Sequence, residues 1–312
     1  MLTTLKNETT TVTVSSLGAE MQSFVSGGID YLWNGDPAYW TGRAPHLFPI
    51  VGGLRGGKAT SDGGDITCAK HGFVRKSELT LVESSDDSAT YALYANDETR
   101  AVYPYDFAFF VKYHLSGTSL KITYEVHNTG DKPLPFCIGG HPGFRVPLTA
   151  EDCFEDYCIE LERKETLDCP QVDMSAALIN DRIRNRVLTN NNKLTLNHVM
   201  FRGDALIFDR LQSRVIRLYS QKTGHGVDMN FESFPFVAVW TPVEDSPFVC
   251  LEPWNGMATC VSEDDVFEHK IGAEILPAGE KSVYHFTLSV YSAKNAVFRA
   301  FAENDNFPAT RK

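Results

Sequence analysis

Apolar and polar residues alternate with a period of two along much of the chain, and this pattern predicts β-strands. In residues 121–128, Ile122, Tyr124 and Val126 share one face while polar side chains occupy the other. Similar runs rich in Val, Ile, Thr, Phe and Tyr predict further strands at 90–95, 106–115, 213–220 and 281–291. Turn-forming residues separate the strands at 116–119, 128–133, 221–226 and 276–282.

Helical periodicity is rare, and the candidates are residues 296–304 and parts of 173–186. Residues 149–193 are more polar and irregular, which predicts an excursion from the sheets rather than a domain boundary. The sequence shows neither an internal repeat nor a low-complexity linker. Many strands separated by short turns predict an all-β protein, a large antiparallel β-sandwich, with residues 1–312 in a single domain.

The composition limits the partners. Hydrophobic residues make up 43% and charged residues 22% of the chain, which permits a large core. The net charge of −11 argues against nucleic acid and anionic membranes as partners, but not against a small neutral molecule or a phosphate in a local basic pocket.

The cysteines and the N-terminus indicate in which cellular compartment the protein works. The seven cysteines are odd in number and contain no CxxC pair, and Cys137 and Cys250 lie in apolar runs, which favours reduced thiols over disulfides. The N-terminus lacks the apolar segment of a signal peptide, and no run approaches the length of a membrane span. We therefore expect a soluble, cytoplasmic protein.

Residues 138–145 read IGGHPGFR and place one titratable group, His141, among glycines and a proline. Pro142 restricts its own backbone and biases His141 toward an extended conformation, which aims the imidazole in one direction. The glycines would leave room for a ligand around it. The simpler interpretation is a tight turn whose histidine binds a carbonyl.

Glu252 follows the apolar run 248–251 and precedes Pro253 and Trp254. A carboxyl group at the end of a buried strand is partly desolvated, and desolvation makes it a better base near neutral pH. The alternative is a glutamate that caps a turn or pairs with an arginine. Trp254 favours a sugar site, since an indole face can cover the apolar face of a pyranose.

His71 lies in the stretch KHGFVR at residues 70–75, and Arg43 and Arg75 could bind hydroxyl groups or a phosphate. The alternatives are a structural histidine and surface ion pairs. The sequence has no HExxH, zinc-binding, EF-hand, P-loop or GxSxG motif, so we expect no metal and no serine nucleophile.

Four stretches together carry a resemblance. In order along the chain they read RAPHLFPIVGG (43–53), KHGFVR (70–75), IGGHPGFR (138–145) and LEPWNG (251–256). The chain resembles the aldose 1-epimerase (galactose mutarotase-like) family, and within it the bacterial branch related to the hexose-6-phosphate mutarotases. The resemblance implies a galactose mutarotase-like supersandwich that binds a sugar in a cleft across one sheet, and an isomerase of carbohydrate metabolism without a cofactor.

The resemblance also implies roles for single residues. His141 matches the catalytic acid, Glu252 the base and His71 a substrate-binding histidine. Asp204 is the candidate for a carboxylate that binds sugar hydroxyls, with Asp209 as the alternative. Arg43 and Arg75 resemble arginines that grip substrate in the phosphosugar branch. Many relatives carry an arginine where this chain has Gly53, and Arg55 lies two residues later.

The predicted function is therefore that of a mutarotase. It would interconvert the α and β anomers of a hexose or hexose phosphate through ring opening and closure. A non-catalytic sugar-binding or regulatory protein on the same fold is the alternative. A glycoside hydrolase is less favoured, because it usually needs two carboxylates and the predicted partner of Glu252 is a histidine.

Overall fold

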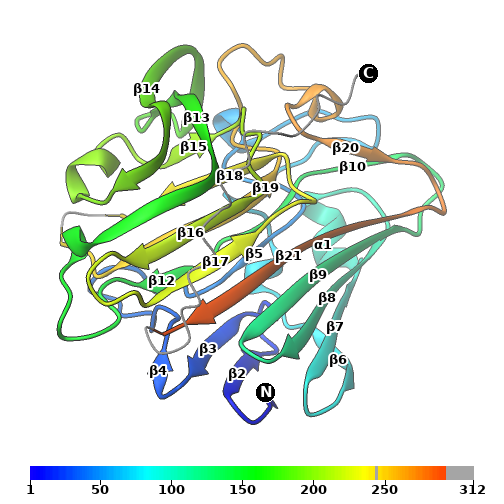
Figure 1. The fold of residues 1–312 in the computed structure, drawn as a ribbon. Helices are drawn as coiled ribbons and strands as arrows, with labels where there is room; N and C mark the ends of the chain where they lie inside the picture. The colour runs from blue at the N-terminus through cyan, green and yellow to red at the C-terminus, as the bar shows by residue number, and fades with distance from the viewer. Residues whose placement is uncertain (243–244, 293–312) are drawn as a thin grey trace, which may run out of the picture.

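The computed structural model describes residues 1–242 and 245–292. Its largest layer is an antiparallel sheet of nine strands in the order β14-β13-β16-β17-β21-β9-β8-β7-β6 (Figure 1). Its strands are β6 (Thr80–Ser84), β7 (Ser88–Tyr94), β8 (Phe107–Ser116), β9 (Ser119–Asn128), β13 (Tyr157–Asp173), β14 (Leu178–Thr195), β16 (Val215–Ser220), β17 (Gly226–Asn230) and β21 (Lys281–Tyr291).

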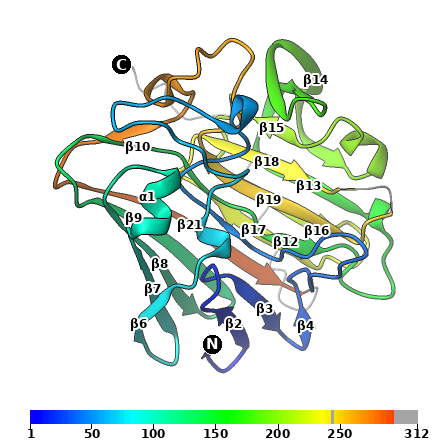
Figure 2. The ribbon, with the colours of Figure 1, turned by 180° about the vertical axis from the view of Figure 1, so that it is seen from behind.

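A second sheet of six strands lies behind the first in this view, and Figure 2 shows it from the other side. Its order is β15-β18-β19-β11-β5, and β12 also pairs with β19. The strands are β5 (His46–Leu47), β11 (Ile138–Gly140), β12 (Gly143–Arg145), β15 (Leu206–Phe208), β18 (Phe236–Trp240) and β19 (Phe248–Asn255).

Smaller elements complete the described part of the chain. An N-terminal sheet contains β1 (Leu2–Lys6), β2 (Thr10–Ser15), β3 (Met21–Ser26) and β4 (Ile29–Asp30), and β10 (Leu134–Phe136) pairs with β20 (Glu274–Leu276). The helix α1 (Asp97–Val102) is joined by five 3-10 turns, η1 (Arg55–Gly57), η2 (Val74–Lys76), η3 (Phe154–Asp156), η4 (His198–Phe201) and η5 (Phe267–His269).

The core lies between the two large sheets. In β9, Ile122, Tyr124 and Val126 are buried, and the side chains between them are more exposed, as the alternation predicts. The six-stranded sheet contacts this layer directly, since the Asn255 amide of β19 donates a hydrogen bond to the Tyr284 hydroxyl of β21 at 2.6 Å. One face of β19 is thus fixed against the core, and its other face is left for the site.

The predicted β-sandwich is confirmed, and strands occupy most of each of the five predicted stretches. The helix predicted within 173–186 is wrong, because β13 and β14 form a long antiparallel hairpin there. This hairpin also replaces the irregular excursion predicted at 149–193, and β13 pairs with β16 as part of the nine-stranded sheet. The helix predicted at 296–304 lies outside the described residues, and the single domain remains a prediction.

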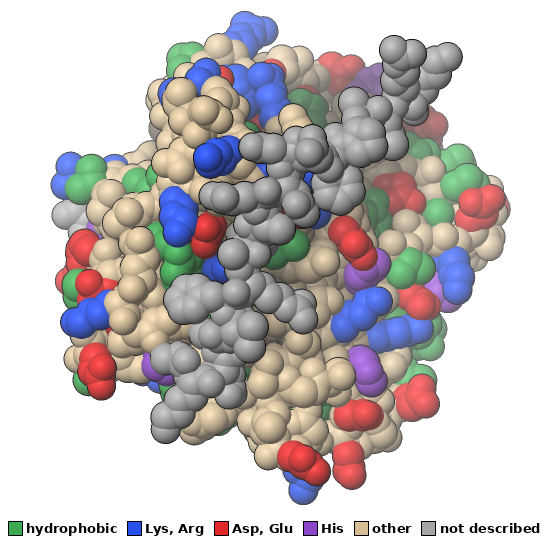
Figure 3. Space-filling model, viewed as in Figure 1, with side chains coloured by type: hydrophobic (Ala, Val, Ile, Leu, Met, Phe, Trp, Pro, Cys, Tyr) green, Lys and Arg blue, Asp and Glu red, His purple; other side chains and the backbone are tan. Residues whose placement is uncertain are grey.

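Charged side chains of both signs are interspersed over the face seen in Figure 3, and basic side chains gather where the β13–β14 hairpin lies. The seven cysteines are free, and all but Cys153 are buried. Within residues 1–242 and 245–292, no helix has the length and hydrophobicity needed to cross a membrane.

Candidate active site

The two faces of β19 have different roles. Val249, Leu251 and Asn255 lie on the face toward the nine-stranded sheet, so Cys250 and Glu252 point to the opposite face. Glu252 is 1% exposed, and the residue paired with it on the adjacent strand β18 is the small residue Ala238. β19 therefore places a buried carboxyl group beside a short side chain.

His141 lies between β11 and β12, and the backbone holds it on both sides. The His141 N–H donates to the Pro45 carbonyl at 3.0 Å, and the Leu251 N–H donates to the Pro142 carbonyl at 3.1 Å. The imidazole Nε2 lies 3.1 Å from Oε2 of Glu252. The two groups are in contact but not aligned as a hydrogen bond, so Glu252 Oε2 has no hydrogen-bond partner, and the other ring nitrogen of His141, Nδ1, has none either.

The glycines around His141 are needed for close packing, which corrects the expectation that they leave room for a ligand. A Cβ at Gly139 would lie 2.8 Å from the Pro253 carbonyl oxygen and from the Trp254 ring. A Cβ at Gly140 would lie 3.0 Å from Phe286 and from the Tyr124 hydroxyl. The missing side chains therefore let β11 approach β19 and the core closely, and this approach brings His141 to Glu252.

His71 has a left-handed backbone with φ of 68°, which is uncommon for a residue with a side chain. Gly72 follows at φ of 72°, and a Cβ there would lie 2.0 Å from the Phe48 carbonyl oxygen. The His71 N–H donates to the Gly52 carbonyl at 2.8 Å, and the Gly52 N–H donates to His71 Nδ1 at 3.2 Å. Because Nδ1 accepts this bond, the ring proton is assigned to Nε2, and the neutral ring can donate to a ligand.

The histidines and Glu252 form a single buried group. The rings of His71 and His141 are nearly perpendicular, with centroids 5.5 Å apart. Burial, together with the smaller effects of the positive charges on Lys70 and Arg75, lowers the pKa of His141 to about 3. Burial, with the same charges and that of a protonated His141, also holds the pKa of His71 well below its usual value.

Burial has the opposite effect on the carboxyl group. It raises the pKa of Glu252 well above the usual 4.5, with a smaller opposing effect from Lys70 and a further increase from Asp204. Burial therefore favours the uncharged form of each group, a neutral imidazole and a carboxylic acid. Transfer of a single proton between them gives an imidazolium and a carboxylate at the same net charge.

The two candidate aspartates have different surroundings. Asp204 acts electrostatically on Glu252, has a left-handed backbone with φ of 74°, and accepts a hydrogen bond from the Ala205 N–H at 2.9 Å. Asp209 instead accepts two hydrogen bonds from the guanidinium of Arg184, at 2.5 and 3.0 Å. Of the two, Asp204 is therefore the aspartate whose charge acts on Glu252, whereas Asp209 is bound to the β13–β14 hairpin.

The two candidate arginines also differ. Arg43 donates from Nη1 to the Gln22 carbonyl at 2.6 Å, so its guanidinium is engaged at β3. Arg75, on η2, acts electrostatically on both His71 and His141, and its Nε is buried without a hydrogen-bond partner. Of the two, Arg75 is the arginine whose charge acts on both histidines.

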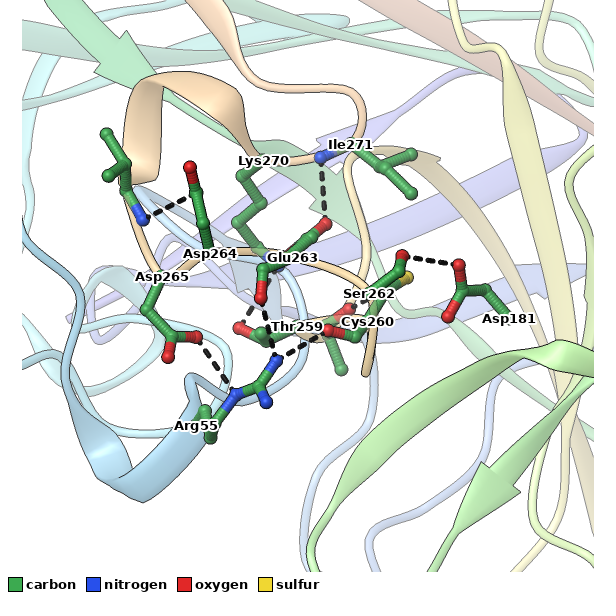
Figure 4. A network of polar contacts seen from close by, with 12 residues as sticks. Arg55, Asp181, Thr259, Cys260, Ser262, Glu263, Asp264, Asp265, Lys270 and Ile271 are labelled. Atoms are coloured by element: carbon green, nitrogen blue, oxygen red, sulfur yellow. Dashed lines mark hydrogen bonds and ion pairs between the residues drawn. The ribbon is translucent and has the colours of Figure 1, made fainter.

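Arg55, two residues after Gly53, has a guanidinium that is already engaged by other groups. Figure 4 shows its guanidinium turned toward the segment 260–265. Nε lies 3.0 Å from the carboxylate of Asp265, and Nη2 donates to the carbonyls of Cys260 and Glu263 at 2.8 and 3.1 Å. Arg55 therefore stabilises this segment.

Aromatic side chains surround His141. Trp254 is 6% exposed, and its Nε1 has no hydrogen-bond partner. Trp40 and Trp240, which are partly exposed and contact the imidazole, were not identified from the sequence. The sequence places Trp40 three residues before the candidate Arg43, which could have drawn attention to it. Residues 33–42 contain no motif, however, that links them to His141.

Within the described ranges, one group of three side chains has the spacing of a metal site. His141, Cys250 and Glu252 each bring an atom within 4.8 Å of the others. Two of them are the imidazole and carboxyl pair, whose proton chemistry requires no ion.

The fold and the pair together define a β-sandwich protein with a buried histidine–glutamate pair. The aldose 1-epimerase family model matches residues 1–289. The chain belongs to the aldose 1-epimerase family, and it is an isomerase of this class with a sugar epimerase role. This confirms the resemblance seen in the four motifs.

Individual relatives agree with the family match. The chain is 38% identical over 273 residues to the chromosomal protein LacX of Lactococcus lactis, covering 85% of this chain and 91% of LacX. It is similar to a galactose mutarotase related enzyme from Lactobacillus acidophilus, at 30% identity and a TM-score of 0.89 over 94% of this chain and 98% of that one. A galactose mutarotase-like protein from Lactobacillus casei gives 25% identity and a TM-score of 0.85 over 93% and 100%.

A substitution of Gly139 tests the close approach of β11 to β19. Gly139→Ala places a methyl group 2.8 Å from a backbone oxygen, and we expect it to destabilise the protein by roughly 1–3 kcal/mol. Gly203→Ala is the matched control, because a Cβ there meets no atom within 4 Å. Urea unfolding of both variants measures the difference, and equal stability would contradict the packing argument.

A second prediction concerns stability and pH. Because the folded state raises the pKa of Glu252 above the unfolded value of about 4.5, wild type loses stability as the pH rises from there toward the folded pKa. Glu252→Gln removes this loss, so the stability of the variant relative to wild type should increase as the pH is raised from about 5 to neutrality. Thermal unfolding across this range measures the difference, and a constant offset would show that the carboxyl group is not protonated in the folded state.

Proposed function

We propose that the protein interconverts the α and β anomers of an aldose, a hexose or hexose phosphate. His141 acts as the acid that protonates the ring oxygen, and Glu252 acts as the base that removes the proton of the C1 hydroxyl. The carrying observation is the contact between Nε2 of His141 and Oε2 of Glu252 at 3.1 Å in a buried site. A general acid and a general base are each typically worth about 10²–10⁴-fold in rate.

The short distance suits this reaction. The ring oxygen and the hydroxyl oxygen are bonded to the same carbon, C1, so an acid and a base that serve both must lie side by side. A retaining glycosidase instead separates its two carboxyl groups by about 5–5.5 Å, so that they act on opposite sides of a bond. The group in contact with Glu252 is an imidazole, which favours anomerisation over hydrolysis of a glycoside.

The proton balance closes within the pair. The C1 hydroxyl gives its proton to Glu252, the ring oxygen takes one from His141, and the C1–ring oxygen bond breaks to give the open-chain aldehyde. Rotation about C1–C2 turns the other face of the aldehyde toward the ring hydroxyl. The hydroxyl then attacks C1 while the two residues exchange roles, and the pair returns to its starting net charge.

The remaining candidates would bind the sugar. His71 offers an Nε2–H donor to a hydroxyl oxygen, because its Nδ1 accepts from Gly52. Asp204 would accept from sugar hydroxyls. Lys70 and Arg75 supply positive charge near the histidines, which favours a substrate with a phosphate. Arg43 and Trp254 would line the sugar site.

We further propose that the enzyme works in the cytoplasm on a small sugar, without a nucleic acid or membrane partner. Its buried, free cysteines suit a reducing compartment, and its net charge is −11.

Anomer exchange measured by saturation-transfer NMR tests the reaction. Glucose, galactose and their 6-phosphates form the panel of substrates, with His141→Asn and Glu252→Gln beside wild type. We expect wild type to accelerate exchange of at least one sugar, and each variant to lose about 10²-fold or more.

The same experiment separates the alternatives. Exchange at near wild-type rate in either variant would refute the assigned acid or base. Saturable sugar binding by wild type without exchange would instead indicate a non-catalytic sugar-binding protein. Release of reducing sugar from a glycoside would indicate a hydrolase.

The two aspartates provide a separate test of the sugar contact. Asp204→Asn should raise KM about tenfold or more, because it removes a charged acceptor for sugar hydroxyls. Asp209→Asn should leave KM unchanged and lower stability, because it weakens the pair with Arg184. Steady-state kinetics and thermal unfolding of both variants measure this, and the reverse pattern would exchange their roles.

A further inference from the structure

Trp40 covers one side of the imidazole of His141. The two rings are stacked, with centroids 4.9 Å apart and planes 29° apart. The other aromatic rings against this imidazole, His71 and Trp240, meet it at 87° and 83°. Among the described residues, Trp40 is therefore the aromatic side chain that stacks on the candidate acid.

The neighbours of Trp40 fix its ring in this position. Its ring stacks on Phe248 with centroids 5.6 Å apart, and the Trp33 Nε1–H donates to the Trp40 carbonyl at 2.8 Å. A Cβ at Gly42 would lie 2.5 Å from the indole, and a Cβ at Gly143 would lie 3.2 Å from it. The indole thus fills a space that two glycines leave open.

This ring faces an acid whose charged form is poorly stabilised. Of the groups around His141, Lys70 and Arg75 disfavour the imidazolium, and Glu252 at 3.1 Å favours it only when ionised. The face of an aromatic ring carries partial negative charge and attracts cations, and indole does so most strongly. An indole stacked on the imidazole adds to the effect of Glu252 without adding a titratable group.

We propose that Trp40 is a positioning residue that holds the plane of the His141 imidazole and stabilises its protonated form during the reaction. The inference deepens the proposed function, because it concerns the acid of that same site. Loss of the indole should lower kcat more than it changes KM, and it should lower the pKa of His141. The effect on kcat should be roughly tenfold.

Three variants test this role. Trp40→Leu removes the aromatic face, Trp40→Phe keeps a smaller one, and Tyr39→Leu removes a ring of the same cluster that contacts Trp33. We expect kcat to fall about tenfold in Trp40→Leu, to fall less in Trp40→Phe, and to stay within about twofold in Tyr39→Leu. Equal losses in Trp40→Leu and Tyr39→Leu would overturn the proposal, because they would indicate general loosening of the cluster.

A second experiment changes the electron density of the indole at position 40 but not its shape. Fluorinated tryptophans introduced at position 40 alone withdraw electron density from the face with little change in size. Stepwise fluorination should lower the pKa of His141, read by NMR titration of the ring, in proportion to the number of fluorines. An unchanged pKa would overturn the proposal.

The NMR titration requires no turnover. If wild type exchanges no anomers but the pKa still falls with fluorination, the proposed function fails and the role of Trp40 in stabilising the imidazolium stands. If exchange is normal and neither kcat nor the pKa responds to changes at position 40, the inference about Trp40 fails alone.

Discussion

The close approach of β11 to β19 determines the geometry of the site. It requires Gly139 and Gly140, since side chains at these positions would collide with Pro253, Trp254, Phe286 and Tyr124. The same approach brings an imidazole to 3.1 Å from the carboxyl group of Glu252, which is 1% exposed. Burial then raises the pKa of Glu252 and lowers that of His141, which favours the uncharged form of each group.

Much of this fold could be predicted from the sequence. The strands at 121–128 and 281–291 alternate because one face of each packs on the core, and period-two burial is visible in sequence. The β13–β14 hairpin could not be predicted in the same way. Many of its residues are partly or fully exposed and the pairing has several register shifts, so the sequence pattern there is irregular.

The residues of the site that lie in sequence motifs could be predicted. Titratable groups in Gly- and Pro-rich surroundings marked His71, His141 and Glu252, and the structure brings these three side chains together. The contacts of Trp40 and the engagement of Arg55 and Asp209 depend on segments far apart in the chain. No local pattern encodes such contacts, and the assigned catalytic and binding roles remain predictions for the experiments.

The contact of Gly140 with Phe286 and Tyr124 joins the site to the centre of the molecule. The loop that carries His141 begins one residue after this contact, so it has no flexible spacer between itself and the core. Close-packed interiors transmit displacements rather than absorb them. On heating, the acid should therefore keep its position until the two sheets separate, and loss of activity and loss of the fold should coincide in one cooperative transition.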